Sequence, residues 1–347
     1  MVILQNVGLD ISLKEFKACF KVRKQDQTDA IKGTRTFTNT PTGFKQFQDW
    51  INKKQQVGVP LRFTMEATGV YYESLAYFLF EQGYSVSVVL PNKSNAYIKS
   101  LNMKSKTDAL EAKALAQMGL ERQLARWEPC SKQMYKIKSL CRERVMLVEE
   151  KTMISNRLHA QKHCRQPDHR IMARMQQRIK LLEKQIKQEE KQLEKLVRQD
   201  TFLSERIEKI CQMKGLNLVT VLTVVSENNG FALIKNKAQL VSYAGYDVVE
   251  RQSGSTLNGK TRISKKGNRY IRRALYFPAF SVIRYNPEFD NLYQRVYDRT
   301  KIKMKGAVAV QRKILVLIYT LFKKNEAYDP NYYASRMGAA SLLTIHS

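Results

Sequence analysis

Hydrophobic and polar positions alternate through the first third of the chain with the two periods that distinguish strands from helices. Five stretches are predicted to be strands: VILQNVGLDIS at the start, FKACFKV (16–22), RTFTN (35–39), LRFTMEA (61–67) and YSVSVVLP (84–91). Of these, FKACFKV and RTFTN alternate with a period of two. Three stretches have helical spacing, which predicts helices: one from about Thr42 with Phe44, Phe47, Trp50 and Ile51 on one face, one from Tyr72 to about Gln82, and KSKTDALEAKALAQM (104–118).

The order of these elements indicates the fold of residues 1–125. Three strands and a helix, followed by strand, helix, strand and helix, is the order of a ribonuclease H-like fold. In such a sheet the first and fourth strands are neighbours, and the last helix packs across them. For the whole chain we expect an α/β domain of this type, a helical coiled-coil insertion and a small, mainly α-helical C-terminal domain.

Residues 126–200 are polar and almost entirely helical in pattern. A basic helix from Met134 to Leu158 precedes a break at Pro167, after which a heptad seam begins. The seam has these residues at its a and d positions: Met172, Met175, Ile179, Leu182, Ile186, Glu189, Leu193 and Leu196. The pattern fits two arrangements equally, a helical hairpin within one chain or a coiled coil between copies.

Residues 201–328 regain a globular composition. The stretch 207–225 predicts two short helices joined at Lys214-Gly215, a turn that resembles a helix-hairpin-helix, except that Asn217 stands where a second glycine is usual. Further helices are expected from about Asn268 to Ile283 and from Val308 to Phe322. The tail, 329–347, is weakly patterned and is expected to be peripheral.

The net charge of the chain limits the classes of partner that it can bind. Among 347 residues, 60 Lys and Arg stand against 31 Asp and Glu, which gives a formal net charge of +29. Hydrophobic residues make up 43%, enough for a packed core. A basic surplus of this size on a folded chain indicates a polyanionic partner. The sequence has no apolar run long enough to span a membrane, and MVILQNVGLDIS has the pattern of a strand rather than of a signal peptide, so we expect nucleic acid as the partner.

The cysteine and histidine residues give little indication of disulfide bonds or of a zinc site. The five cysteines are widely spaced and odd in number, which favours reduced thiols over a disulfide framework. A cluster of four potential ligands, namely His159, His163, Cys164 and His169, raises the question of zinc. A polar helix end is the favoured interpretation, because structural zinc needs four well-placed ligands.

Four acidic residues fall where the predicted fold would bring them together. Asp10 lies late in the first strand, Glu66 ends the fourth, and Asp108 and Glu111 are i, i+3 on the last helix. Clustered carboxylates need a compensating cation, so their convergence predicts a divalent metal site. Two Mg²⁺ ions, with Mn²⁺ as the alternative, would stabilise the attacking and leaving oxygens of a phosphate. Taken alone, Asp108 also fits a helix cap and Glu111 a surface charge.

The stretch RQSGSTLNGKTRISKKGNRYIRR joins small hydroxyls to dense positive charge. Ser253 and Ser255 flank Gly254, and a serine beside cations can attack a phosphate if a base or metal activates it. No histidine lies nearby in the sequence, so activation of the serine would come from the carboxylate–metal cluster. On sequence pattern alone, a loop of this kind more commonly binds phosphate or has no chemical role. We expect these residues to bind nucleic acid: Lys260, Arg262, Lys265, Lys266, Arg269, Arg272 and Arg273.

Two groups of motifs resemble one family. GLDIS, MEATGVY and KTDALEA resemble the signature stretches of the DEDD RuvC-like domain in the IS one-ten group of insertion-sequence transposases. SYAGYDVVERQSGSTLNGKTRISKKGNRYIRRALY resembles the second signature domain of the same group. The resemblance covers about residues 5–325, with both domains in the family's order.

This resemblance implies a bridge-RNA-guided DNA recombinase. It places Asp10, Glu66, Asp108 and Glu111 at the family's acidic tetrad and Ser253 at its nucleophile, with Ser255 as the second choice. The family has Asp at the fourth position, so Glu111 is a departure. The resemblance also implies donor and target double-stranded DNA, a structured guide RNA, and a tetramer, arranged as a dimer of dimers, whose active site combines acids and serine from different subunits. Such a protein would work in a prokaryotic cytoplasm, in association with the nucleoid.

Two other functions fit parts of the same pattern. One is a metal-dependent RuvC-like nuclease, such as a junction resolvase, that uses activated water. The other is a non-catalytic nucleic-acid-binding protein on a decayed nuclease fold. The sequence shows no zinc finger or RNP-type motif, which favours recognition delegated to a pairing RNA.

Overall fold

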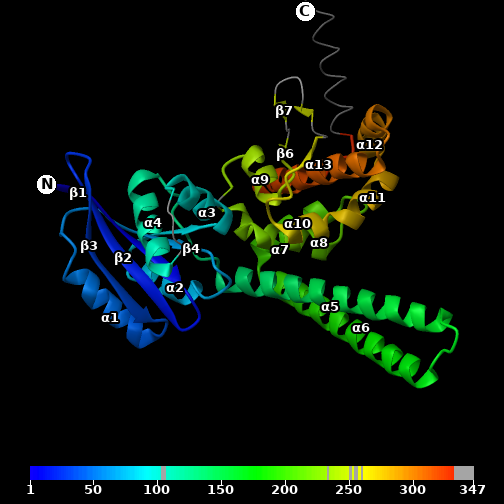
Figure 1. Ribbon diagram of the computed structural model, residues 1–347. Coiled ribbons are helices and arrows are strands. Elements are labelled where there is room, and N and C mark those ends of the chain that lie inside the picture. Colours follow the sequence, from blue (N-terminus) through cyan, green and yellow to red (C-terminus); the bar gives the residue numbers. More distant parts are fainter. Residues whose placement is uncertain (103–106, 233, 250–251, 254–256, 259–260, 332–347) are drawn as a thin grey trace, which may run out of the picture. The chain divides into compact units, whose positions relative to one another are not determined.

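The computed structural model describes residues 1–102, 107–232, 234–249, 252–253, 257–258 and 261–331 (Figure 1). The chain divides into two compact units, Met1–Pro129 and Cys130–Ser347, each with its own hydrophobic core. In the described part of the chain, no helix is both long enough and apolar enough to cross a membrane.

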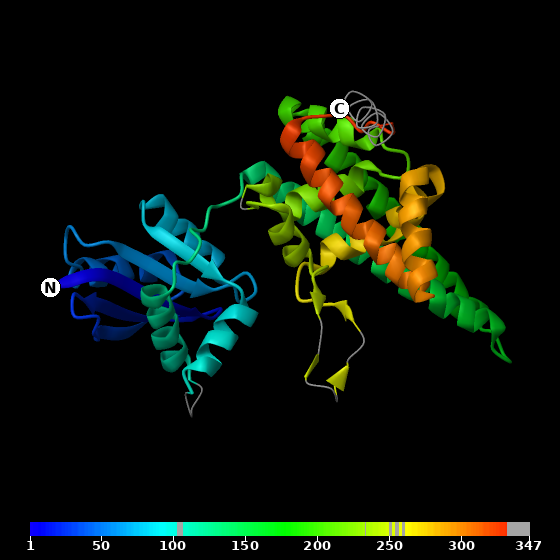
Figure 2. The ribbon, with the colours of Figure 1, turned by 90° about the horizontal axis from the view of Figure 1, so that it is seen from above.

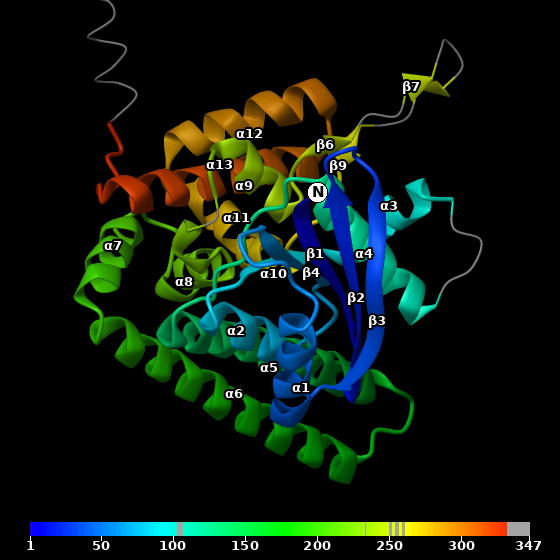
Figure 3. The ribbon, with the colours of Figure 1, turned by 90° about the vertical axis from the view of Figure 1, so that its left-hand side faces the viewer.

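A five-stranded sheet forms the centre of the first unit, and Figure 3 shows its first three strands side by side. The strands are β1 (Val2–Ile11), β2 (Glu15–Lys24), β3 (Asp29–Thr38), β4 (Leu61–Glu66) and β5 (Ser85–Val89). Their order is β3-β2-β1-β4-β5; the first three pair antiparallel, whereas β4 is parallel to both β1 and β5. This order confirms the predicted ribonuclease H-like fold.

Four helices complete this unit: α1 (Pro41–Asn52), α2 (Glu73–Glu81), α3 (Pro91–Ser100) and α4 (Asp108–Glu121). The helices α1 and α2 pack on one face of the sheet in an aromatic core that includes Phe16, Phe47 and Trp50. The helix α4 packs on β1, β2 and β4. Because side chains alternate along a strand, β1 gives Val7 and Leu9 to the aromatic core and turns Asn6 and Gly8 towards α4.

The approach of α4 to the sheet is very close. A Cβ at Gly8 would lie 2.1 Å from the Ala112 carbonyl oxygen, and a Cβ at Gly119 would lie 2.1 Å from Asn6 Nδ2. The Asn6 amide donates to the Ala116 carbonyl oxygen at 2.8 Å. Two glycines, small helix residues and one buried amide therefore fix where α4 rests on β1.

A long helical hairpin begins the second unit (Figure 1). It consists of α5 (Lys132–His163) and α6 (His169–Arg198). Leu147 and Ile154 of α5 pack against Leu182 and Ile186 of α6. The predicted heptad seam is therefore used within one chain, in the first of the two expected arrangements.

The rest of the second unit is mainly helical. Its elements are α7 (Thr201–Cys211), α8 (Leu218–Glu227), η1 (Asn229–Phe231), α9 (Lys237–Ala244), α10 (Arg269–Ala274), α11 (Tyr276–Tyr285), α12 (Pro287–Thr300) and α13 (Lys303–Lys324). Buried residues of these helices form one core. Between α9 and α10, strand β6 (Val248–Val249) pairs with β9 (Arg262–Ile263), and β7 (Gln252–Ser253) pairs with β8 (Leu257–Asn258) (Figure 2).

The turn between α7 and α8 has a packing function. Gly215 adopts φ +98°, and a Cβ there would lie 2.7 Å from the Val282 amide nitrogen on α11. Asn217, at the place of the second glycine, accepts a hydrogen bond from the Thr220 amide at 2.8 Å and so caps α8. The turn thus supports α11 rather than presenting a glycine-rich surface.

Candidate active site

Four carboxylates come together in the first unit. Asp10 is the penultimate residue of β1, and Glu66 is the last residue of the adjacent parallel strand β4. Asp108 opens α4, and Glu111 lies one turn further along. Thr107, not Asp108, is the helix cap, since its side chain accepts from the Leu110 amide. The capping alternative for Asp108 is therefore wrong, and its carboxylate is not used for that purpose.

The close packing of α4 explains this convergence. Asp10 is two residues beyond Gly8 on the same face of β1, and the Ala112 carbonyl of α4 rests on Gly8. The first turn of α4, with Asp108 and Glu111, is thereby held near the end of β1. Thr64, two residues before Glu66, donates to Asn6 Oδ1 at 3.2 Å and ties β4 to the same face.

The carboxylates are close enough to influence one another electrostatically. Burial, together with the negative charges of Glu111, Asp108 and Glu66, raises the pKa of Asp10 from 3.8 to about 6. The ammonium of Lys17, which faces Asp10 across the β1–β2 pair, opposes this rise in pKa. A carboxyl group whose pKa is raised by burial and by neighbouring carboxylates lies where a bound cation would be stabilised.

Three neighbouring side chains contact these carboxylates. Ser94, fully buried near the start of α3, donates to Glu66 Oε2 at 2.5 Å, and Thr68 donates to Glu66 Oε1 at 3.2 Å. Lys17 Nζ lies 3.5 Å from Asp108 Oδ2. Sequence reasoning missed Ser94 and Lys17. Of the two, only Lys17 could have been found from the sequence, because the alternation of β2 places it on the same face of the sheet as Asp10.

The donor set fits a divalent metal ion in its chemistry. All four side chains offer carboxylate oxygens, which hard cations such as Mg²⁺ prefer, and their mutual repulsion would be relieved by positive charge. As the side chains stand, the described residues contain no group of three or more His, Cys, Asp or Glu set to hold a metal. The rings of His159 and His163 are 4.4 Å apart, but these two histidines do not belong to a group of that kind among the described residues either.

The predicted serine loop lies in the second unit. The backbone of Ser253 is in β7 and pairs with Leu257 of β8. At the base, Ser264 donates to Asp247 Oδ1 at 2.7 Å, and β6 pairs with β9. Ser255 and Lys260 lie outside the described residues. The structure thus places the backbone of Ser253 between strands whose base packs on the helical core through Ile263 of β9.

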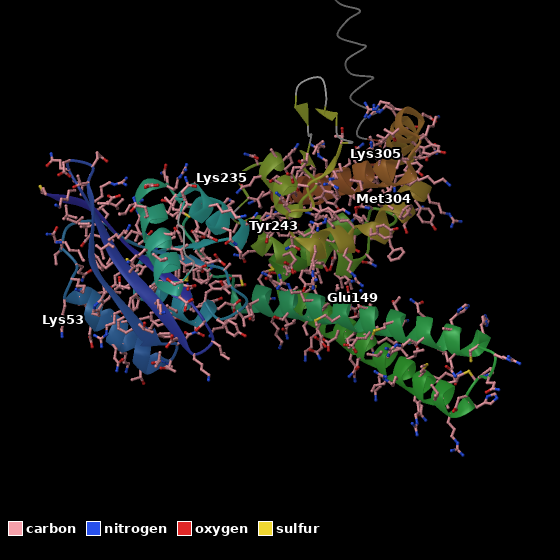
Figure 4. The ribbon with its side chains drawn as sticks, in the orientation of Figure 1. Lys53, Glu149, Lys235, Tyr243, Met304 and Lys305 are labelled. Atoms are coloured by element: carbon pink, nitrogen blue, oxygen red, sulfur yellow. The ribbon has the colours of Figure 1, made fainter. Side chains whose placement is uncertain are left out.

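The other predicted nucleic-acid-binding residues fall into two groups. Arg262, Lys265, Lys266 and Arg269 are exposed. Arg272 instead donates to the Ala244 carbonyl oxygen at 2.8 Å, and Arg273 pairs with Glu149 of α5, which Figure 4 labels. The exposed group is the one whose cations can reach phosphates from solvent.

A buried ion pair supports this basic region. Glu227 is buried and accepts from Arg142 at 2.6 and 2.8 Å and from the amide of Asn268, the residue that caps α10, at 2.6 Å. Tyr243, labelled in Figure 4, donates to the Glu227 carbonyl oxygen. The network joins α5, α8 and α9 to the start of α10. Sequence reasoning missed it, since the partners are far apart along the chain.

The strand order and the acidic cluster at the ends of β1 and β4 define the class: a ribonuclease H-like enzyme fold of the kind that transposases use. Two family models match the chain. Residues 7–161 match a transposase model of the DEDD type of IS110, and residues 207–294 match the transposase IS116/IS110/IS902 family. Together they cover more than half of the chain. The protein belongs to the IS110 family of transposases.

The chain is also similar in sequence to three named proteins. The chain is 29% identical to the pilin gene-inverting protein of Moraxella lacunata over 334 residues, which are 93% of this chain and 97% of that protein. The protein of the same name from Moraxella bovis is 28% identical over the same length. An uncharacterised 43.6 kDa protein of insertion element IS110 from Streptomyces coelicolor is 26% identical over 133 residues, 38% of this chain and 31% of that one.

Among solved structures, Thermus thermophilus RuvC in complex with Holliday junction substrate is 9% identical and covers 36% of this chain and 100% of that one, with a TM-score of 0.28. The family assignment rests on the two family models, and the fold on the strand order, rather than on this likeness.

Proposed function

We propose that this transposase is an RNA-guided, Mg²⁺-dependent DNA recombinase that cuts and rejoins strands through a covalent bond to Ser253. The observation that carries the proposal is the clustering of Asp10 with Glu66, Asp108 and Glu111. Burial, together with the negative charges of these three neighbours, raises the pKa of Asp10 to about 6. Carboxylates that lie close together despite their electrostatic repulsion are typical of functional sites.

The four carboxylates would hold the metal. Bound there, Mg²⁺ supplies positive charge that stabilises the attacking and leaving oxygens of a phosphate. Ser94 and Thr68 orient Glu66, and Lys17 places its ammonium group beside Asp108. Glu111, one methylene longer than the family's Asp, can still offer a carboxylate oxygen.

The cleavage step exchanges one ester bond for another. A bond forms between Ser253 Oγ and phosphorus while the bond from phosphorus to one sugar oxygen breaks; the serine loses a proton and the leaving oxygen gains one. The phosphoserine keeps the energy of the diester, so a strand hydroxyl can reverse the step without ATP. The name of the Moraxella relatives supports this over hydrolysis, since inverting a gene requires that every cut strand be rejoined.

Partners follow from the family and from charge. We propose donor and target double-stranded DNA and a structured guide RNA, bound through exposed cations such as Lys265, Lys266 and Arg269. Subunits would assemble as a tetramer, a dimer of dimers, in which the acids of one subunit act with the serine of another. The site of action would be the DNA of a prokaryotic cytoplasm.

The first experiment is to purify the protein from its native host and sequence the RNA that copurifies. One discrete RNA with two segments complementary to DNA sites supports guidance and supplies the substrates. Heterogeneous RNA would favour an unguided enzyme.

The second experiment compares Ser253→Ala with Ser255→Ala on those substrates, with protein–DNA adducts detected by denaturing electrophoresis. Ser253→Ala should abolish both cleavage and adduct, whereas Ser255→Ala should retain them. Cleavage that persists without an adduct in Ser253→Ala would establish instead a nuclease that uses activated water. Unchanged activity in Asp10→Ala would indicate that the acidic cluster takes no part.

A further inference from the structure

The helix α11 carries an unusual set of exposed aromatic side chains. Phe277 is 75% exposed, Tyr285 55%, Phe280 41% and Tyr276 37%. Elsewhere in the described part of the chain, exposed aromatic residues occur singly, as Tyr71, Tyr135 and Phe202 do. Four exposed rings on one ten-residue helix concentrate apolar surface in one place, which is typical of an interaction site.

Three of these rings lie against one another. Tyr276 lies with its ring centroid 5.1 Å from Phe277 and 5.5 Å from Phe280, both in edge-to-face geometry. The opposite side of α11 is buried through Ala279 and Val282. One side of the helix therefore anchors it in the core, and the other presents ring faces and edges to solvent.

Positive charge surrounds the rings. The segment 269–285 has arginines at 269, 272, 273 and 284 and no acidic residue. Arg269 lies over the Tyr270 ring at 5.0 Å, and Arg284 lies over the Tyr285 ring at 5.8 Å. Neither makes an ion pair within the described residues, so both can meet phosphates.

A cavity of about 280 Å³ adjoins this surface, and Phe277, Arg144 and Arg273 are among its lining residues. Its two arginines face acids from neighbouring helices: Arg144 pairs with Glu190 at 2.7 Å, and Arg273 pairs with Glu149. The polar part of its lining includes Asn217 and Ser281. The cavity offers space beside Phe277 for a flat ring displaced from a stack of bases.

From this arrangement we propose that α11 is a stacking platform for unpaired bases of a DNA strand. We name the set Tyr276, Phe277, Phe280 and Tyr285 the aromatic platform. Aromatic rings interleaved with cations suit a single strand, because bases stack on the rings while phosphates meet the arginines. A duplex hides its base faces and would leave the rings without partners.

A second copy of this chain is a poorer occupant. In a two-fold interface the same patch meets itself, which would place the arginines of segment 269–285 against one another, and that segment has no acidic residue to offset them. DNA is favoured over RNA as the strand because this inference rests on the proposed function: strand exchange exposes unpaired DNA, and α10 follows β9 of the serine hairpin after a short connection.

The test uses full-length protein without divalent cations, so that no cleavage occurs. A short single-stranded DNA containing 2-aminopurine reports stacking by fluorescence quenching, and anisotropy gives the affinity. The same sequence as duplex DNA and as single-stranded RNA provides the comparison. Phe277→Ala with Phe280→Ala removes two platform rings. The matched control is Phe202→Ala on α7, where the phenylalanine is 61% exposed, a value between those of Phe280 and Phe277.

We expect the double variant to bind single-stranded DNA about fivefold more weakly or worse, with quenching lost and duplex binding unchanged. Phe277→Leu, which keeps an apolar side chain of similar size, should lose quenching even if the double variant folds poorly. The proposal is overturned if both variants retain quenching, if duplex and single-stranded binding fall equally, or if RNA binding alone falls. A change in oligomeric mass by light scattering would assign the surface to subunit contact instead. Because binding without metal is independent of Ser253, failure here leaves the proposed chemistry untouched, and failure of the Ser253 experiment leaves this binding result standing.

Discussion

Replacing Asp10 by Asn should stabilise the first unit at neutral pH while abolishing catalysis. In the folded chain, burial and three neighbouring carboxylates raise the pKa of Asp10 from 3.8 to about 6. The folded state therefore binds this proton more tightly than the unfolded state does. The stability due to Asp10 is fully present below about pH 4 and is lost as the pH rises through 6.

The magnitude follows from the size of the change in pKa. A rise from 3.8 to about 6 corresponds to about 3 kcal/mol of unfolding free energy. Because Asp10 is only partly buried, solvent screening reduces the expected effect to about 1–2 kcal/mol. Asn has the same shape without the charge, so Asp10→Asn should gain this amount at pH 8 and nothing at pH 3.5.

Urea unfolding over a pH series measures the effect. Both tryptophans of the chain, Trp50 and Trp127, lie in the first unit, so their fluorescence reports its unfolding alone. Asp49→Asn, at an exposed position on α1, is the control and should show no gain. Added Mg²⁺ should stabilise the wild type but not Asp10→Asn. If Asp10→Asn follows the wild-type pH profile, the carboxylates do not act on one another and the metal-site reasoning fails.

Three further substitutions test other parts of the structure. Gly8→Ala should cost about 3 kcal/mol in the same urea assay, because its Cβ would meet the Ala112 carbonyl at 2.1 Å; wild-type stability would contradict the packing of α4. Ser94→Ala should weaken Mg²⁺ binding about tenfold by calorimetry, with Ser94→Thr retaining more of it. Glu227→Ala should destabilise the second unit by about 3 kcal/mol in a thermal melt, since it leaves Arg142 unpaired.

Much of the sheet was predictable because strand alternation is a local signal. The strands containing Asp10 and Glu66 were predicted within a few residues of their observed bounds. The strand β3 was predicted too short, as 35–39, although it runs over Asp29–Thr38. Most of its residues are exposed or half-buried, so its pattern is weak, and its pairing with β2 is what defines it.

Helix boundaries in the second unit were harder to predict. One helix was expected from about Asn268 to Ile283, but the chain forms α10 and α11, which meet at Leu275. Pro278 has no amide hydrogen to donate to the Ala274 carbonyl, so a continuous helix would lose a hydrogen bond there. The helices α3 and α12 were not predicted. Both have polar sequences and begin at prolines, Pro91 and Pro287.

The sequence by itself determined the order of elements, the faces on which the acids lie, and the resemblance to one family of transposases. Those features depend on neighbouring residues and on side-chain periodicity. Tertiary structure alone decided the contacts between Ser94 and Glu66, Lys17 and Asp108, and Arg142 and Glu227, whose partners are 28, 91 and 85 residues apart. Carboxylates repel one another, so no local preference gathers them. The close packing of α4 on β1 supplies the free energy that holds them together.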